Sequence, residues 1–307
     1  MKKKKIVIAG GTGFIGKYLA GKFEVMDYEV LIISRNVTHI NWEDEKGMID
    51  ALENSDMLIN LAGKSVDCRY TQKNKKEILL SRTGTTVKLG EAILRCKNPP
   101  VLWINSGTAT IYRHAEDRPM TETKGEIGKG FSVDVATAWE KTFFSFKLPK
   151  TRMVVLRMAI VLGKNGGVIN PLTNLVRFGL GGKQGKGTQM FSWIHIVDLY
   201  NIIRFIQSQN QLEGIFNCAA PNPVDNKTFM TSLRQKMNIG IGLPSAEWLL
   251  NIGAYFINTE TELILKSRWV TPERLILSGF CFEYPTIDDA LTNIIEKRED
   301  VDFKPAY

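Results

Sequence analysis

Three glycines spaced three residues apart stand between an apolar run and a helical pattern early in the 307-residue chain. The segment reads Gly10-Gly11-Thr12-Gly13-Phe14-Ile15-Gly16. In such a loop the first glycine allows a tight turn, the second lets the backbone approach a pyrophosphate, and the third lets a helix pack on a strand. Free N–H groups and the positive end of the helix then hold the phosphates. We expect a dinucleotide site here, in which Thr12, Phe14 and Ile15 take part; a purely structural glycine turn is the alternative.

The residues that follow the second expected strand decide which dinucleotide fits. An acidic residue there accepts a hydrogen bond from the ribose 2′-OH, whereas an arginine pairs with a 2′-phosphate. The sequence has Ser34 and Arg35 at this turn and no carboxylate. These residues favour NADP(H) as the cofactor. The alternative is that Arg35 is an ordinary loop arginine and that the site does not discriminate.

The elements that must position this loop alternate through the first two thirds of the chain, which is typical of βαβ units and a parallel sheet. Continuous apolar runs, such as that at 57–61, are expected for strands covered on both faces. The predicted fold class is α/β, a Rossmann-type doubly wound parallel sheet with a smaller, mostly helical substrate-side and C-terminal region. We expect strands at 6–9, 30–33, 57–61, 101–105, 153–156 and 215–217, and helices at 14–26, 72–95, 135–146 and 198–207.

The composition of the sequence changes after residue 162, where glycines become frequent, and again at 238–244. We expect an NADP-binding Rossmann domain over 1–240, with a substrate-side insertion around 163–190, and a small C-terminal domain over 241–307. The glycine-rich run at 179–187 is either a backbone nest for an anionic substrate, with Lys183 and Lys186 as its charges, or a flexible surface loop.

Composition narrows the classes of partner. The formal net charge of +8 and the pI near 9.2 permit attraction to phosphates or acidic ligands. No recognition helix, RNP-like strand or clustered arginine face indicates nucleic acid. No apolar stretch approaches the roughly 18 residues that span a bilayer, so no membrane association is expected, and the expected location is the cytoplasm. The four cysteines lie far apart without metal-ligand spacing, which predicts neither disulfides nor a metal site.

Several blocks carry a family resemblance. GGTGFIG, the segment Asn60-Leu61-Ala62-Gly63 and Tyr112 after a serine- and threonine-rich strand end resemble the extended short-chain dehydrogenase/reductases. The chain resembles more narrowly the atypical epimerase-family branch, which carries its own C-terminal domain of unknown function. The blocks are INLAG, SRTGTT at 81–86, WE at 139–140, LRMAIVLGKNGG at 156–167, GLGGKQGKGTQMFSWIHIVDL at 179–199 and APNPVDNKTF at 220–229.

The resemblance implies an NADP-binding protein and assigns roles by position. It places the adenosine phosphate at Ser34 and Arg35. It implies polar roles at the cofactor for Glu77 and Arg82; the alternative is a helix-surface charge and a helix-packing arginine. The remaining implied cofactor contacts are backbone or apolar and fall on Leu61, Ala62, Gly63 and Val161.

The usual catalytic pair of the short-chain dehydrogenases is missing. That pair is Tyr-x-x-x-Lys on one helix, where positions i and i+4 share a face, and in extended members a glutamate follows four residues later. Anchoring on Glu140 puts the lysine at Ala136 and the tyrosine at Ser132, and neither can exchange a proton as the pair does. No tyrosine occurs at 125–147.

Other residues are candidates for the catalytic step. Thr108 is the candidate for the substrate-orienting hydroxyl, with Ser106 as its alternative, and Tyr112 is the nearest phenol downstream; a structural role competes for each. His195 and Asp198 invite a proton-relay interpretation, but the apolar alternation around them favours structural roles, with Asp198 capping the helix that follows.

Two functions remain open. The first is an NADP(H)-dependent oxidoreductase or epimerase-like enzyme with an unconventional proton donor, Tyr112 or an ordered water. Its substrate would be a small molecule, an anionic or nucleotide-linked compound being one option. The second is a non-catalytic NADP(H)-binding redox sensor or regulatory protein. Neither the substrate nor the oligomeric state follows from the sequence.

Overall fold

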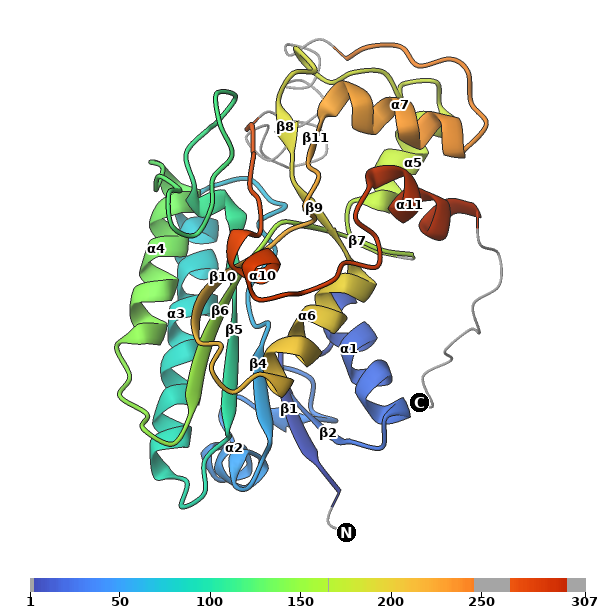
Figure 1. The fold of residues 1–307 in the computed structure, drawn as a ribbon. Helices are drawn as coiled ribbons and strands as arrows, with labels where there is room; N and C mark the ends of the chain where they lie inside the picture. Colours follow the sequence, from blue (N-terminus) through green and yellow to red (C-terminus); the bar gives the residue numbers. More distant parts are fainter. Residues whose placement is uncertain (1–2, 165, 246–265, 297–307) are drawn as a thin grey trace.

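A computed structural model describes residues 3–164, 166–245 and 266–296. Its centre is a seven-stranded parallel sheet in the order β10-β6-β5-β4-β1-β2-β3 (Figure 1). Strand order reverses between β1 and β4, and in open α/β sheets ligands bind outside the carboxyl ends of the strands at such a point. The strands are β1 (Lys5–Ala9), β2 (Glu29–Ser34), β3 (Ile40–Asn41), β4 (Met57–Asn60), β5 (Leu102–Thr108), β6 (Arg152–Met158) and β10 (Gly214–Cys218).

Alternate residues of the central strands point into two separate cores, because successive side chains of a strand face opposite sides of the sheet. Ile6 and Ile8 of β1 pack with α1 and α6, whereas Val7 and Ala9 pack with α2, α3 and α4. Both faces are therefore covered, as the continuous apolar runs predicted, and the fold class is confirmed. These helices are α1 (Phe14–Val25), α2 (Glu45–Leu52), α3 (Gln72–Arg95), α4 (Phe131–Phe144) and α6 (Ile196–Ser208).

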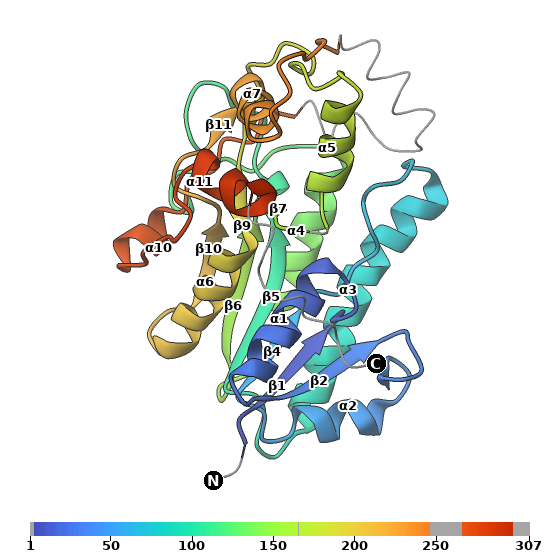
Figure 2. The ribbon, with the colours of Figure 1, turned by 90° about the vertical axis from the view of Figure 1, so that its right-hand side faces the viewer.

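Beyond the carboxyl ends of the strands lies a smaller group of elements with its own apolar cluster (Figures 1 and 2). Two short ribbons contribute, β7 paired with β9 and β8 paired with β11. The elements are β7 (Ile160–Leu162), α5 (Ile169–Arg177), β8 (Met190–Phe191), β9 (Trp193–His195), β11 (Val224–Asp225), α7 (Asn226–Lys236), α11 (Ile287–Leu291) and the π-helical turn Thr292–Glu296. The short helix α10 (Glu273–Leu277) packs instead against the main core through Leu275.

The C-terminal region is tied to both parts. Of the domain predicted at 241–307, residues 246–265 and 297–307 lie outside those that the structure describes. Leu243 and Ser245 exchange backbone hydrogen bonds with residues 179–185 of the glycine-rich run. Further on, Arg268 donates to Met190, and Met120 donates to Trp269. The described part of this region therefore bridges the Rossmann body and the outer elements.

The start of α6 differs from the expectation. His195 is the N-cap, and its Nδ1 accepts a hydrogen bond from the Val197 amide at 3.3 Å. Asp198 lies inside the helix, and its carboxylate accepts hydrogen bonds from the amides of Glu283 and Tyr284 at 2.8 and 3.0 Å. Both residues are structural, as predicted, but Asp198 anchors the 283–284 loop and does not cap the helix.

None of the helices in 3–164, 166–245 or 266–296 is long and apolar enough to cross a bilayer.

Candidate functional site

The loop after β1 has the tight geometry that its glycines predict. Gly10 has a φ of +77°, a region that side chains rarely adopt, and its amide donates to the Ile33 carbonyl at 2.8 Å. A Cβ on Gly10 would lie 2.8 Å from the Ala62 backbone. The loop therefore passes between the ends of β2 and β4, at the point where the strand order reverses.

Helix α1 begins with an end that no side chain caps. Gly13 is the N-cap and provides no side-chain hydrogen bond, and no acidic residue stands in the first turn. A Cβ on Gly13 would meet only the Gly10 carbonyl, at 4.0 Å, so the space before the helix is open. A Cβ on Gly16 would lie 2.5 Å from Gly11, so this glycine allows α1 to pack on the loop. The exposed N–H groups and the helix dipole suit an anion such as a pyrophosphate.

The residues between these glycines differ in exposure. Thr12 is exposed at the loop's outer side, whereas Ile15 packs against the core beneath α1. Phe14 is half-buried, and a Cβ on Gly163 or Gly166 would come within 3 Å of its ring. The glycines after β7 therefore close over Phe14. Val161 itself packs against the main core, outside the pocket described below.

The end of β2 presents an exposed cation. Ser34 is buried; its Oγ lies 3.1 Å from Nδ1 of His39 and accepts a hydrogen bond from the Asn36 amide at 3.0 Å. Arg35 is exposed and makes no ion pair with any residue that the structure describes. The hydroxyl shapes the turn and the guanidinium is available to a phosphate. The glycine cradle, the uncapped helix and Arg35 thus fit a 2′-phosphorylated dinucleotide.

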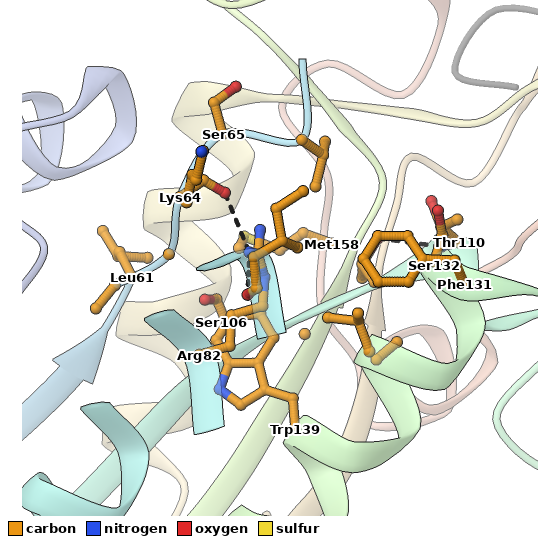
Figure 3. A pocket seen from close by; sticks show the side chains of 18 of the residues that line it. Leu61, Lys64, Ser65, Arg82, Ser106, Thr110, Phe131, Ser132, Trp139 and Met158 are labelled. Atoms are coloured by element: carbon orange, nitrogen blue, oxygen red, sulfur yellow. Dashed lines mark hydrogen bonds between the residues drawn. The ribbon is translucent and has the colours of Figure 1, made fainter. Parts of the chain in front are cut away.

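A cavity of about 330 Å³ lies at the carboxyl ends of β4 and β5, between α3 and α4 (Figure 3). Its wall is apolar apart from hydroxyls and two cationic residues. The lining consists of Leu61, Ala62, Gly63, Lys64, Ser65, Val66, Tyr70, Ile78, Arg82, Ser106, Gly107, Thr108, Thr110, Phe131, Ser132, Val135, Ala136, Trp139 and Met158.

Arg82 enters this cavity from α3. Its Nη1 donates to the carbonyls of Lys64 and Ile78 at 3.1 and 3.0 Å, and its guanidinium lies 5.3 Å from the centre of the Trp139 ring (Figure 3). A Cβ on Gly63 would come within 3.1 Å of it. Burial lowers the pKa of Arg82, an effect that the charge interaction with Tyr70 opposes. The cation is held by carbonyls and an aromatic face and keeps N–H groups for a ligand.

Glu77 is the second residue of α3 for which the resemblance implies a contact with the cofactor. It is not among the residues that line the cavity. It pairs with Lys64, whose Nζ is 2.5 Å from its Oε2 and 2.7 Å from Oδ1 of Asn74. The hydrogen bond from Lys64 lowers the pKa of Glu77. Glu77 therefore holds the side chain of Lys64, the residue whose carbonyl accepts from Arg82. A direct cofactor contact for Glu77 stays a prediction.

A buried polar network supports the floor of the cavity. Asn60 donates to Oδ1 of Asn105 at 2.7 Å and to Oγ1 of Thr86 at 3.3 Å, and its own Oδ1 accepts from the Ala62 amide at 3.0 Å. Trp139 donates through Nε1 to the same Thr86 oxygen at 2.9 Å. The network joins β4, β5, α3 and α4, and it orients both Ala62 and the ring against which Arg82 lies.

The two positions of the missing catalytic pair do face the cavity. Ser132 and Ala136 both line it, one turn apart on α4, and Thr108 and Ser106 line it from β5. Glu140, the glutamate from which these two positions were counted, is buried and forms a bidentate ion pair with Arg157. Nε and Nη2 of Arg157 donate to its two carboxylate oxygens, each at 2.8 Å. The register therefore places both positions on the α4 wall of this cavity, where they carry side chains other than the usual tyrosine and lysine.

Tyr112 occupies a structural position. It is 2 % exposed, and its Oη donates to Oδ1 of Asn217 at 2.8 Å and accepts from Nη1 of Arg157 at 2.9 Å. Burial raises its pKa. It is not among the residues that line the cavity. The phenol belongs to the Glu140–Arg157 network, so the structure favours the structural alternative over Tyr112 as a proton donor.

The glycine-rich run at 179–187 is well bonded and lies away from the cavity. The amide of Gln184 donates to Oδ1 of Asn226 at 2.8 Å, and the Asn226 amide group returns a bond to Oε1 of Gln184 at 3.1 Å. Lys183 and Lys186 are exposed. The run is thus a hydrogen-bonded and partly buried segment, and none of its residues is among those that line the cavity.

The sequence reasoning missed several lining residues. Tyr70 and Phe131 form an aromatic wall with ring centres 4.9 Å apart and a near-perpendicular angle of 68°. The sequence presents Trp139 only as part of the WE motif and assigns no role to Lys64. These residues come from the loop before α3 and from α4, and their proximity depends on the packing of those two elements. The available signal was an aromatic residue, Tyr70, in a loop that leaves the end of a buried strand.

Comparison with known families gives two matches. Residues 6–219 match the family model described as the NAD dependent epimerase/dehydratase family, and residues 246–294 match one described as a domain of unknown function. The chain is 32% identical over 306 residues to the epimerase family protein YfhF of Bacillus subtilis, covering 96% of this chain and 99% of that protein.

Two solved structures resemble this one over most of its length. One is the human epimerase family protein SDR39U1, crystallised with NADPH, with a TM-score of 0.85, 29% identity and coverage of 95% of this chain and 99% of that one. The other is a nucleoside-diphosphate sugar epimerase from Corynebacterium glutamicum, with a TM-score of 0.77, 26% identity and coverage of 98% and 60%.

Proposed function

The chain belongs to the NAD dependent epimerase/dehydratase family, and from this premise we propose that it binds NADP(H) and acts as an oxidoreductase or epimerase-like enzyme on a small molecule. The observation that carries the proposal is the uncapped start of α1 together with an exposed Arg35 at the end of β2 that makes no ion pair within 3–164, 166–245 or 266–296. The human relative crystallised with NADPH supports the choice of cofactor. We retain the cytoplasm, expected from the sequence, as the location.

Different residues would bind different parts of the cofactor. The amides of residues 13–16 would hold the pyrophosphate, and Arg35 would pair with the 2′-phosphate. Leu61, Ala62 and Gly63 would carry the cofactor past the end of β4 toward Arg82. When bound, the cofactor supplies or takes up two electrons and one hydrogen at the nicotinamide ring.

The remaining cavity sets the class of substrate. Its walls are aromatic and aliphatic, its polar groups are hydroxyls from β5 and α4, and Arg82 adds a cation. Such a site suits a compact carbonyl or alcohol with a polar or anionic substituent. A nucleotide-linked sugar is one such compound, and the name of the Corynebacterium relative, a nucleoside-diphosphate sugar epimerase, supports testing it.

Calorimetry tests the cofactor assignment. The full chain should bind NADPH more tightly than NADH. Arg35→Ala should weaken NADPH binding about 10- to 100-fold, since a charge-assisted bond is worth about 1.5–3 kcal/mol, and should leave NADH binding unchanged. Arg95→Ala is the matched control, an exposed arginine that pairs with Glu45 at the far end of α3. No heat with either nucleotide would refute the proposal.

A second function has an observation in its favour. Ser132 and Ala136 stand where a proton-exchanging pair is usual, which supports a protein that binds NADP(H) without turnover and senses its redox state. A panel of carbonyl compounds and nucleotide sugars separates the two. Turnover of any member with NADPH supports the enzyme, whereas tight binding without turnover, together with a partner selective for one redox form, supports the sensor.

A further inference from the structure

The cavity contains one phenol among its described lining residues, and it comes from outside α4. Tyr70 lies in the loop between β4 and α3, and its Oη is 3.4 Å from Oγ of Ser132. Ser132 is the position at which the sequence register expects the catalytic tyrosine. The phenol oxygen of Tyr70 therefore lies within hydrogen-bond distance of the side chain that stands where the family has its catalytic tyrosine.

The surroundings hold this phenol in place. The Tyr70 ring packs edge-on against Phe131 at 4.9 Å, and Nζ of Lys75 lies 5.2 Å from the centre of the Phe131 ring. Next to it, Thr71 caps α3 by accepting a hydrogen bond from the Asn74 amide, and the Asn74 side chain donates to the Arg69 carbonyl at 2.7 Å. The loop is thus fixed on both sides of the tyrosine, as a catalytic group requires.

The charge of the missing lysine also has a replacement. Ala136 leaves space in the wall, and Arg82 brings a guanidinium into the same cavity from α3. Two carbonyls and the Trp139 ring fix it, and it interacts electrostatically with Tyr70. A nearby cation favours the phenolate over the phenol. An arginine serves this purpose as a permanent charge, because it does not lose its proton in proteins.

We propose that Tyr70 is the proton donor of this site and that Arg82 is the positioning cation that stabilises its phenolate. The proposal rests on the function proposed above. In reduction of a carbonyl by NADPH, the carbonyl carbon gains a hydrogen and two electrons from the cofactor. The Oη–H bond of Tyr70 breaks, an O–H bond forms on the carbonyl oxygen, and the phenolate regains a proton from water. In the oxidative direction the phenolate accepts the alcohol proton.

The other candidates near the cavity are less suited. Tyr112 is engaged by Asn217 and Arg157 and does not line the cavity. Thr108 and Ser132 are hydroxyls, which are far weaker acids than a phenol and need a base beside them. Lys64 is paired with Glu77. Ser132 then has a clear part: its Oγ is placed to relay or orient the Tyr70 proton.

The first test reads the ionisation of Tyr70 without cofactor or substrate. The full chain is titrated by the ultraviolet absorbance of phenolate and compared with Tyr70→Phe, which keeps the contact with Phe131. We expect one tyrosine of the eight to form phenolate ahead of the others. That component should vanish in Tyr70→Phe and move to higher pH in Arg82→Met. A component that survives in Tyr70→Phe, or the absence of any early component, overturns the proposal.

The second test measures reduction of an aromatic 1,2-diketone and of a nucleotide-linked 4-keto sugar with NADPH. Tyr70→Phe should lower kcat about 100-fold or more, the contribution usual for a general acid, with an unchanged Kd for NADPH. Tyr28→Phe, a buried tyrosine at the amino-terminal edge of the sheet, is the matched control. A wild-type rate in Tyr70→Phe overturns the assignment of Tyr70 alone, whereas failure of the full chain to bind NADPH overturns the function proposed above.

Discussion

The buried cap of α6 makes the stability of the fold depend on pH in a defined direction. His195 is 1 % exposed, its Nδ1 accepts the Val197 amide hydrogen, and its ring lies 3.9 Å from that of Tyr284. Burial lowers the pKa of His195 to about 4, although the side chain of Asn293 opposes the shift. Protonation of Nδ1 would also abolish the cap, since an imidazolium nitrogen donates and cannot accept.

The size of the effect follows from linkage. The folded chain binds this proton only near pH 4, whereas the unfolded chain binds it near pH 6.5. The stabilisation is therefore complete above about pH 6.5 and falls as the pH drops toward 4, by up to about 3 kcal/mol. Asp198 acts in the opposite sense. Burial raises its pKa, so its contribution is lost as the pH rises, and the histidine must be isolated by a variant.

The assay is urea denaturation of wild type and His195→Asn at a series of pH values from 4 to 8. Asparagine is a good N-cap that does not titrate, so the variant carries a constant penalty for the lost ring. The free energy difference between the two proteins should shrink by about 3 kcal/mol from pH 7 to pH 4. His114→Asn, at a half-exposed histidine, is the control. Parallel curves for wild type and His195→Asn would refute the account of the buried cap.

Three further predictions concern the site and its supports. Gly10→Ala should abolish NADPH binding in calorimetry and cost about 1–3 kcal/mol of stability, because the residue has a φ of +77° and faces backbone at 2.8 Å; wild-type affinity would contradict this. Tyr112→Phe should cost about 1–3 kcal/mol in urea denaturation, since Asn217 and Arg157 lose a partner, and should leave the Kd for NADPH unchanged; an altered Kd with full stability would count against the structural role. Glu140→Ala should cost about 3–5 kcal/mol by leaving Arg157 buried and unpaired, and a loss below 1 kcal/mol would show that the pair is not buried in solution.

The parts of the fold that could be predicted have local signals. The run at 57–61 is apolar throughout because β4 is covered on both faces, and its observed bounds, Met57–Asn60, differ by one residue. The glycines at 10, 13 and 16 specify a turn, an open helix start and a close packing distance, and their spacing signals all three even though the backbone that Gly10 approaches is that of Ala62. Sequence spacing is sufficient for features of this kind.

Contacts between distant residues were not predictable in the same way. The expected cap of α6 was Asp198, a residue type that often caps helices, but its carboxylate instead binds amides 85 and 86 residues further along the chain. The sequence allows Arg82 either a polar role at the cofactor or helix packing, and its observed partners are two carbonyls and an aromatic ring brought near by the packing of α3 on α4. No periodicity within one helix contains that information.

The difference between signals along the sequence and contacts between distant residues also affects whether the cavity can be judged catalytic. A search for Tyr-x-x-x-Lys compares positions along α4 and finds serine and alanine. Proton transfer requires only that a phenol and a cation reach the same volume, whichever element supplies them. Tyr70 lies against Ser132, and Arg82 shares the cavity with Ala136. The loss of the pair from α4 therefore argues against catalysis only if Tyr70 and Arg82 prove inert, which makes these two residues the decisive ones to change.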